Sequence, residues 1–73
     1  MWDRIEASWQ QLRGLARQKW SRLTDEQLEV IAGKRERLLA TLQAEYRISK
    51  AEAELEVQEW EAIVRGWEQR RRG

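Results

Sequence analysis

The first third of the chain carries an apolar residue at every third or fourth position. The members of this series are Trp2, Ile5, Trp9, Leu12, Ala16 and Trp20. Such spacing is typical of an amphipathic helix, and it predicts a helix over residues 3 to 19. Gly14 lies inside that helix, where a glycine costs about 0.5–1 kcal/mol relative to alanine. It therefore indicates either a bend or a close approach of another helix backbone.

Two short motifs predict where later helices begin. Thr24 followed by Gln27, and Ser49 followed by Glu52, both have the form of a capping box. In this motif the first side chain accepts a hydrogen bond from the fourth backbone amide, and the fourth side chain reaches back to the first amide. We therefore predict that a second helix starts at Thr24 and a fourth at Ser49.

The remaining apolar positions fill out these helices. Leu28 and Ile31 give the second helix its apolar face, with Val30 as a further candidate, and Gly33 is suited to end it. The pattern then predicts a third helix from 34 to 46 and a fourth that ends near residue 68. Their apolar stripes are Leu38, Leu39, Leu42 and Tyr46 in the third, and Ala53, Val57, Trp60, Val64 and Trp67 in the fourth, with Leu55 and Ile63 flanking the last stripe.

Composition supports an all-α protein. The 73 residues are 41% hydrophobic and 37% charged, without proline or cysteine, which favours helices with solvated charged faces over disorder or a disulfide scaffold. We predict one domain over residues 1–73, in which residues 69–73 form a frayed basic tail. A core this small supplies about 3–5 kcal/mol. Five tryptophans are expected to strengthen it, with Trp9, Trp20 and Trp60 buried.

The sequence also favours a cytoplasmic location. The absence of cysteine is compatible with a reducing compartment. No segment approaches the about 20 apolar residues of a membrane span, and no basic-then-apolar leader opens the chain.

The residues available for chemistry are few. Without histidine and cysteine, the commonest general base, thiolate chemistry and structural zinc sites are excluded. Glu52, Glu56 and Glu59 share a helical face, but such a face is usually solvated and gathers too few oxygens for calcium. Gly33-Lys34-Arg35 lacks the remainder of a phosphate-binding loop. We therefore predict that the protein is not an enzyme and that it binds neither a cofactor nor a metal ion.

Nucleic-acid association is the alternative function that charge suggests. The cations that could contact phosphates are Arg13, Arg17, Lys19 and Arg22 in the first third and Arg70, Arg71 and Arg72 at the end. The formal net charge is only +1, however, and five acidic residues between Glu52 and Glu61 would repel a polyanion. A solvated surface is the favoured interpretation.

An exposed apolar face offers a third kind of function. Trp2 and Trp67 lie near the chain ends, so they are the tryptophans best placed to contact a partner protein or a membrane surface. Together with Arg70, Arg71 and Arg72 they form the predicted interaction surface.

An ordered set of residues resembles the CsbD-like family of small bacterial general stress proteins. It comprises Trp9-Gln10-Gln11-Leu12-Arg13-Gly14, Trp20, Leu23-Thr24-Asp25, Ile31-Ala32-Gly33-Lys34-Arg35, Leu42-Gln43, Tyr46, Ser49-Lys50, Ala53-Glu54 and Trp60. This match runs from about residue 4 to 61 in one register.

The resemblance implies a compact four-helix bundle of two roughly orthogonally packed helical hairpins. It also implies a cytoplasmic protein produced during general stress, with no known reaction, cofactor or catalytic residue. Arg47 departs from the family pattern, because glycine usually follows the tyrosine, so the loop after Tyr46 is expected to differ. We therefore expect a non-enzymatic stress-response protein that acts as a protein-interaction or protective module.

Overall fold

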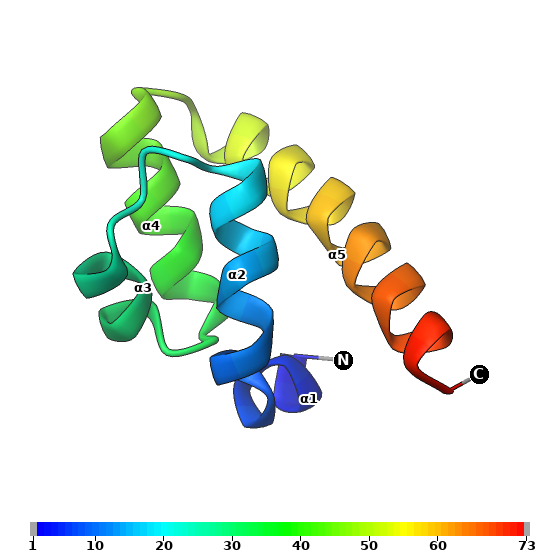
Figure 1. The fold of residues 1–73 in the computed structure, drawn as a ribbon. Helices are drawn as coiled ribbons and strands as arrows, with labels where there is room; N and C mark the ends of the chain where they lie inside the picture. The colour runs from blue at the N-terminus through cyan, green and yellow to red at the C-terminus, as the bar shows by residue number, and fades with distance from the viewer. Residues whose placement is uncertain (1, 73) are drawn as a thin grey trace.

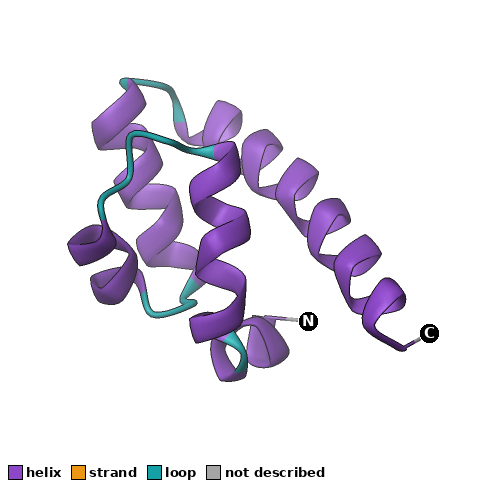
Figure 2. Cartoon of the chain, in the orientation of Figure 1, coloured by secondary structure: helices purple, strands orange, loops and turns teal. Residues whose placement is uncertain are grey.

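The chain folds into helices joined by short turns. The computed structural model describes residues 2–72, and the side chains of residues 2–71. Within this part of the chain there are five helices and no strand (Figures 1 and 2). Their bounds are α1 Trp2–Ala7, α2 Trp9–Lys19, α3 Asp25–Ile31, α4 Arg35–Tyr46 and α5 Lys50–Arg72. The all-α prediction is confirmed, but four helices were predicted.

The additional helix arises because the first helix breaks at Ser8. Ser8 leaves the helical conformation, with φ −105° and ψ 19°. Its amide still donates to the carbonyl of Arg4 (3.0 Å), and its own carbonyl accepts from Leu12 (3.0 Å), so the break is a single-residue turn. The bend proposed for Gly14 is wrong. A Cβ atom at Gly14 would meet nothing within 4 Å, so no helix backbone approaches it either.

Both predicted capping boxes are confirmed. At α3 the amide of Gln27 donates to Thr24 Oγ1 (3.1 Å), and the amide of Thr24 donates to Gln27 Oε1 (2.9 Å). At α5 the amide of Glu52 donates to Ser49 Oγ, and the amide of Ser49 donates to Glu52 Oε1, both at 3.1 Å. Each box satisfies two amides that a helix start leaves unpaired. α5 then continues to Arg72, beyond the predicted end near residue 68.

Left-handed residues end α3 and α4. Ala32 and Gly33 follow α3 with φ values of 51° and 76°, and Arg47 follows α4 with φ 53°. At Gly33 a Cβ atom would lie 2.6 Å from the Cα of Glu6, so glycine is required where α1 packs against the α3–α4 turn. Arg47 adopts the left-handed conformation that it disfavours, at a cost of about 1–2 kcal/mol.

Trp60 lies at the centre of the core. It is fully buried, and its ring contacts Trp2, Trp9 and Trp20 at centroid distances of 6.0, 6.2 and 5.8 Å. Trp9 and Trp20 are buried as well, so the predicted assignment of these three tryptophans to the core is confirmed. The indole N–H of Trp60 has no hydrogen-bond partner, which is a cost that the close aromatic packing must offset.

α5 packs on two other helices, α2 and α4. α3 packs on α4, and α1 packs on α2. Figure 1 shows α3 and α5 on opposite sides of the molecule, with α2 and α4 between them. The arrangement as two orthogonal hairpins stays a prediction. None of the described helices combines the length and apolar character needed to cross a membrane.

Candidate interaction surface

Trp2 is half-buried at the start of α1 and is held by α5. Its ring lies 6.0 Å from that of Trp60, and its indole N–H donates to Glu61 Oε2 at 2.6 Å. Two residues later, Arg4 forms an ion pair of 3.2 Å with Glu68. Trp2 is therefore fixed in place by α5, with part of its ring in solvent.

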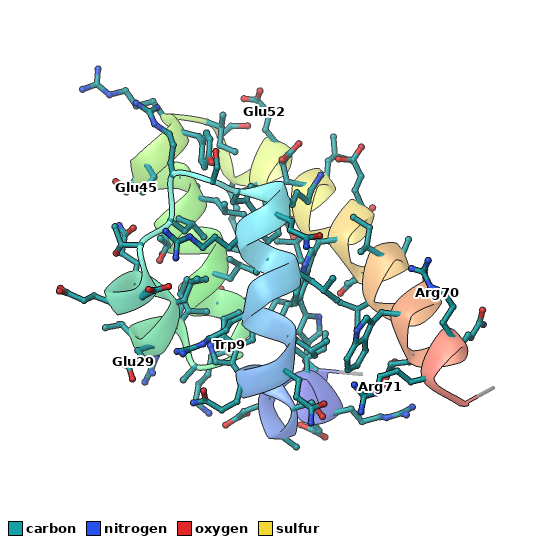
Figure 3. All side chains as sticks on the ribbon, in the orientation of Figure 1. Trp9, Glu29, Glu45, Glu52, Arg70 and Arg71 are labelled. Atoms are coloured by element: carbon teal, nitrogen blue, oxygen red, sulfur yellow. The ribbon has the colours of Figure 1, made fainter. Side chains whose placement is uncertain are left out.

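Trp67 is half-buried on α5 itself. It packs against the core cluster, and the guanidinium carbon of Arg71 lies 4.8 Å from its ring centroid, a cation–π distance. Arg70 and Arg71 are exposed near the end of α5 (Figure 3). The side chain of Arg72 lies outside the described residues. The structure thus brings Trp67 and Arg71 together, while Trp2 contacts a different part of α5.

Three large aliphatic residues are exposed. Val30, a candidate for the apolar face of the second predicted helix, is 68% exposed, so that candidate assignment is wrong. Leu55 and Ile63, expected to flank the core stripe of the last helix, are 61% and 42% exposed, and the sequence signal of this exposure is their offset from the core spacing. The stripe of α5 advances by four and three residues through Val57, Trp60 and Val64, and neither Leu55 nor Ile63 falls on it.

The outward side of α5 is therefore a candidate surface, on which Gln58 and Glu59 separate Leu55 from Ala62 and Ile63. Leu55, Ala62 and Ile63 are exposed there, while the opposite side of the helix packs on α2 and α4. Trp67 and Arg70 continue the same helix toward its end. We use the name α5 surface for the following set: Leu55, Ala62, Ile63, Trp67 and Arg70.

Three of the cations proposed for nucleic-acid binding are engaged within the chain. Arg17 pairs with Asp25 at 2.7 Å, and Lys19 pairs with Glu59 at 3.1 Å. The side chain of Arg22 donates to the carbonyl of Glu45 at 3.4 Å. Exposed pairs of this kind contribute about 0–1 kcal/mol each, but they hold the cations beside acidic groups. Three of the four cations proposed in the first third are therefore already in contact with polar groups of the chain.

Lys34 and Arg35, considered above for phosphate binding, also face carboxylates. Lys34 Nζ lies 2.6 Å from Glu6 Oε1, and Arg35 Nη2 lies 3.7 Å from Glu54 Oε2. Gly33, which precedes them, is needed for the contact with α1. Lys34 thus pairs with a residue of α1, and Arg35 pairs with a residue of α5.

The carboxylates of α5 have structural partners. Glu52 completes the second capping box, Glu56 accepts from the indole N–H of Trp20 at 3.1 Å, and Glu59 pairs with Lys19. Over the described residues, no group of three or more acidic side chains is arranged to hold a metal ion. Ser49, one of the serines in the chain, serves as a cap.

Comparison with known proteins then identifies the family. A UPF0337 protein of Pectobacterium atrosepticum is 42% identical over 59 residues, which cover 81% of this chain and 86% of the relative. The UPF0337 protein YjbJ of Escherichia coli is 37% identical over 59 residues, with the same coverage of both chains. This chain belongs to the UPF0337 (CsbD-like) family. The family resemblance of the sequence is thereby confirmed.

Further comparisons show how much of a longer relative the chain matches and which searches find no match. A UPF0337 protein of Nitrosomonas europaea is 43% identical over 56 residues, and the matching segment spans 60% of that relative's length. No model of a protein family and no solved structure matches the chain. The UPF0337 relatives carry names that state no reaction, so the comparisons give this chain a family without an activity.

Proposed function

We propose that this UPF0337 protein is a non-enzymatic interaction module that engages a protein partner through the α5 surface. The observation that carries the proposal is the exposure of Leu55 and Ile63 on a helix whose opposite side packs on α2 and α4. Monomeric proteins expose scattered apolar residues, but Leu55, Ala62 and Ile63 lie within about two turns of one helix, with the exposed side chains of Gln58 and Glu59 between Leu55 and Ala62. An amphipathic partner helix is the kind of structure that such a surface accommodates.

The chemistry of the α5 surface suits binding. Burial of a leucine or isoleucine side chain contributes about 1.5–3 kcal/mol, so Leu55 and Ile63 together could supply much of a modest affinity. Trp67 and Arg70 are of the residue types most often found at the energetic centres of interfaces. The half-buried indole of Trp67 is already held by Arg71, so little conformational freedom would be lost on binding.

The cellular role proposed is protection or signalling during bacterial stress, in the cytoplasm. This part rests on the resemblance to the CsbD-like family. Nucleic-acid association has less support, because Arg17, Lys19 and Arg22 already contact acidic or carbonyl groups.

Survival of a stressed host tests the proposal. A bacterial strain lacking its own copy would be complemented with the natural chain or with Leu55→Glu combined with Ile63→Glu, under the stress that induces the gene. Both substitutions fall on exposed side chains, so folding should be retained. We expect the double variant to lose protection, whereas Gln11→Glu combined with Gln18→Glu on the exposed side of α2 should protect normally. Equal protection by the α5 double variant would refute the proposed role of this surface.

A further inference from the structure

The outward side of α5 carries charges of opposite sign near its two ends. Glu52 lies in the first turn of the helix and Arg70 in the last turn, and both are exposed (Figure 3). Neither has an ion-pair partner among the described side chains. Glu52 uses Oε1 in the capping box, so its other oxygen stays available for a further contact.

Helical spacing places these charges and the apolar residues of α5 on the same outer side. Glu52 and Arg70 are eighteen residues apart, which is close to five helical turns. Leu55 and Gly66 are eleven residues apart, close to three turns, and Ala62 lies between them two turns after Leu55. The charged pair and the apolar residues therefore form two neighbouring rows, at the edge of the molecule that α5 forms in Figure 1.

A second copy of α5, turned end to end, is complementary to these rows. The midpoint between Glu52 and Arg70 and the midpoint between Leu55 and Gly66 fall in the same turn of the helix, just before Ala62. One two-fold axis through that turn therefore sets the acidic end of each helix beside the basic end of the other, and each leucine beside a glycine. In a parallel pair, by contrast, like charges would meet.

Gly66 provides space for the leucine of the second copy. A Cβ atom at Gly66 would meet only Arg70 Nη2, at 4.0 Å, so the space beside this glycine is bounded by one flexible side chain. An ion pair with Glu52 of the second copy would draw the Arg70 side chain away from it. Near the two-fold axis, the small and exposed Ala62 lets two helices approach closely.

The acidic end of α5 also borders a hollow that suits a guanidinium group. This hollow has a volume of about 410 Å³, and Tyr46, Ile48 and Glu52 are among the residues that line it. Two further carboxylates of the lining already contact Trp20 and a lysine of α2, which leaves Glu52 to pair with an incoming cation. An arginine from a second copy would find both a carboxylate and an aromatic ring there.

We infer that two copies of this chain pair through antiparallel α5 helices, with Glu52 of each beside Arg70 of the other and Leu55 of each beside Gly66 of the other. The inference rests on the proposed function, because it names the partner of the α5 surface. Both copies use the same patch, so the contact closes as a two-fold dimer and does not extend into chains. A contact of one helix from each copy is small, so the dimer should be weak and should dissociate as salt is added.

Reversal of the charges tests this pairing by sedimentation velocity on the full chain at low salt. Arg70→Glu places carboxylates against carboxylates at both ends of the contact, and Glu52→Arg places cations against cations. Each variant alone should therefore dimerise with a dissociation constant about tenfold or more above that of the natural chain. An equimolar mixture of the two should form a heterodimer of natural affinity, because opposite charges then meet at both ends.

Two further variants separate the contact from general effects of charge and folding. Gly66→Leu fills the space for Leu55 without a change of charge, so it should also prevent dimerisation. Gln11→Glu with Gln18→Glu lowers the net charge by two, as Arg70→Glu does, but on the exposed side of α2. It should dimerise like the natural chain. Circular dichroism checks that each variant folds, including Glu52→Arg, which loses one bond of the capping box.

Three results would overturn the inference: a natural chain that stays monomeric at millimolar concentration, Arg70→Glu or Gly66→Leu chains that dimerise with natural affinity, or a mixture of the charge-reversed variants that stays monomeric. The proposed function fails by a different result, which is normal protection by the Leu55 and Ile63 double variant. A monomeric chain that needs these two residues for protection would assign the α5 surface to another protein.

Discussion

Gly33 shows how a single residue determines the position of two segments. Its φ of 76° suits glycine, and its missing Cβ leaves space for the backbone of Glu6, which would otherwise be 2.6 Å away. The helical glycines Gly14 and Gly66 differ, since a Cβ would meet nothing within 4 Å at the first and only the end of the Arg70 side chain, at 4.0 Å, at the second. The same residue type is thus required at one position and replaceable at two.

Alanine substitutions should separate these positions. At Gly33, alanine would combine left-handed strain of about 1–2 kcal/mol with overpacking of about 1–3 kcal/mol, so we expect the free energy of unfolding to fall by roughly 2–5 kcal/mol. Gly14→Ala and Gly66→Ala should each raise it by about 0.5–1 kcal/mol. Urea denaturation measures all three. A neutral Gly33→Ala would contradict the close approach of α1.

The tryptophans should also differ in their access to a quencher. Trp9, Trp20 and Trp60 are at most 5% exposed, whereas Trp2 and Trp67 are half-buried. Acrylamide should therefore quench only part of the fluorescence, and Trp2→Phe combined with Trp67→Phe should remove most of the quenchable part. Uniform quenching of all five indoles would contradict the assignment of the core.

At the scale of helices, the capping boxes fix boundaries that the apolar pattern alone leaves open. Thr24 and Ser49 could be identified from the sequence because a capping box depends on residues only three positions apart. The break at Ser8 could not, because Ser8 makes no side-chain capping bond and Ile5 and Trp9 on either side keep helical spacing. Only the fit of α1 against the rest of the molecule distinguishes one helix from two.

Removing the side chains of Thr24, Ser49 and Ser8 tests which of them stabilise a helix start. Thr24→Ala and Ser49→Ala each remove a bond to a backbone amide, and we expect each to lower the free energy of unfolding by about 1 kcal/mol. Ser8→Ala is the matched control, since the hydroxyl of Ser8 caps nothing, and it should change stability by less than about 0.5 kcal/mol. Thermal or urea unfolding gives these values, and an equal loss at all three serines and threonines would refute the role of the caps.

For the whole molecule, the core could be predicted from spacing, but the surfaces only in part. Trp60 falls on a stripe of period three to four, so its burial follows from sequence. Leu55 lies two residues from both Ala53 and Val57, so its offset from the core stripe already indicates exposure. Val30 lies beside the buried Ile31, and its exposure depends on how the helices are arranged. The distribution of charged residues over the surface also depends on the fold. Glu29 and Arg70 are far apart in the sequence, and only the fold shows that they lie on opposite sides of the molecule (Figure 3).

The use of the α5 surface for contact with a partner is the central claim, and site-specific photo-crosslinking in living cells tests it most directly. A benzophenone amino acid would be placed at position 63 on the α5 surface or at the exposed position 18 on α2, and cells would be irradiated during stress. We expect a discrete protein adduct from position 63 that is lost when Leu55→Glu is added, and none from position 18. An adduct that survives Leu55→Glu, or equal adducts from both positions, would contradict the claim.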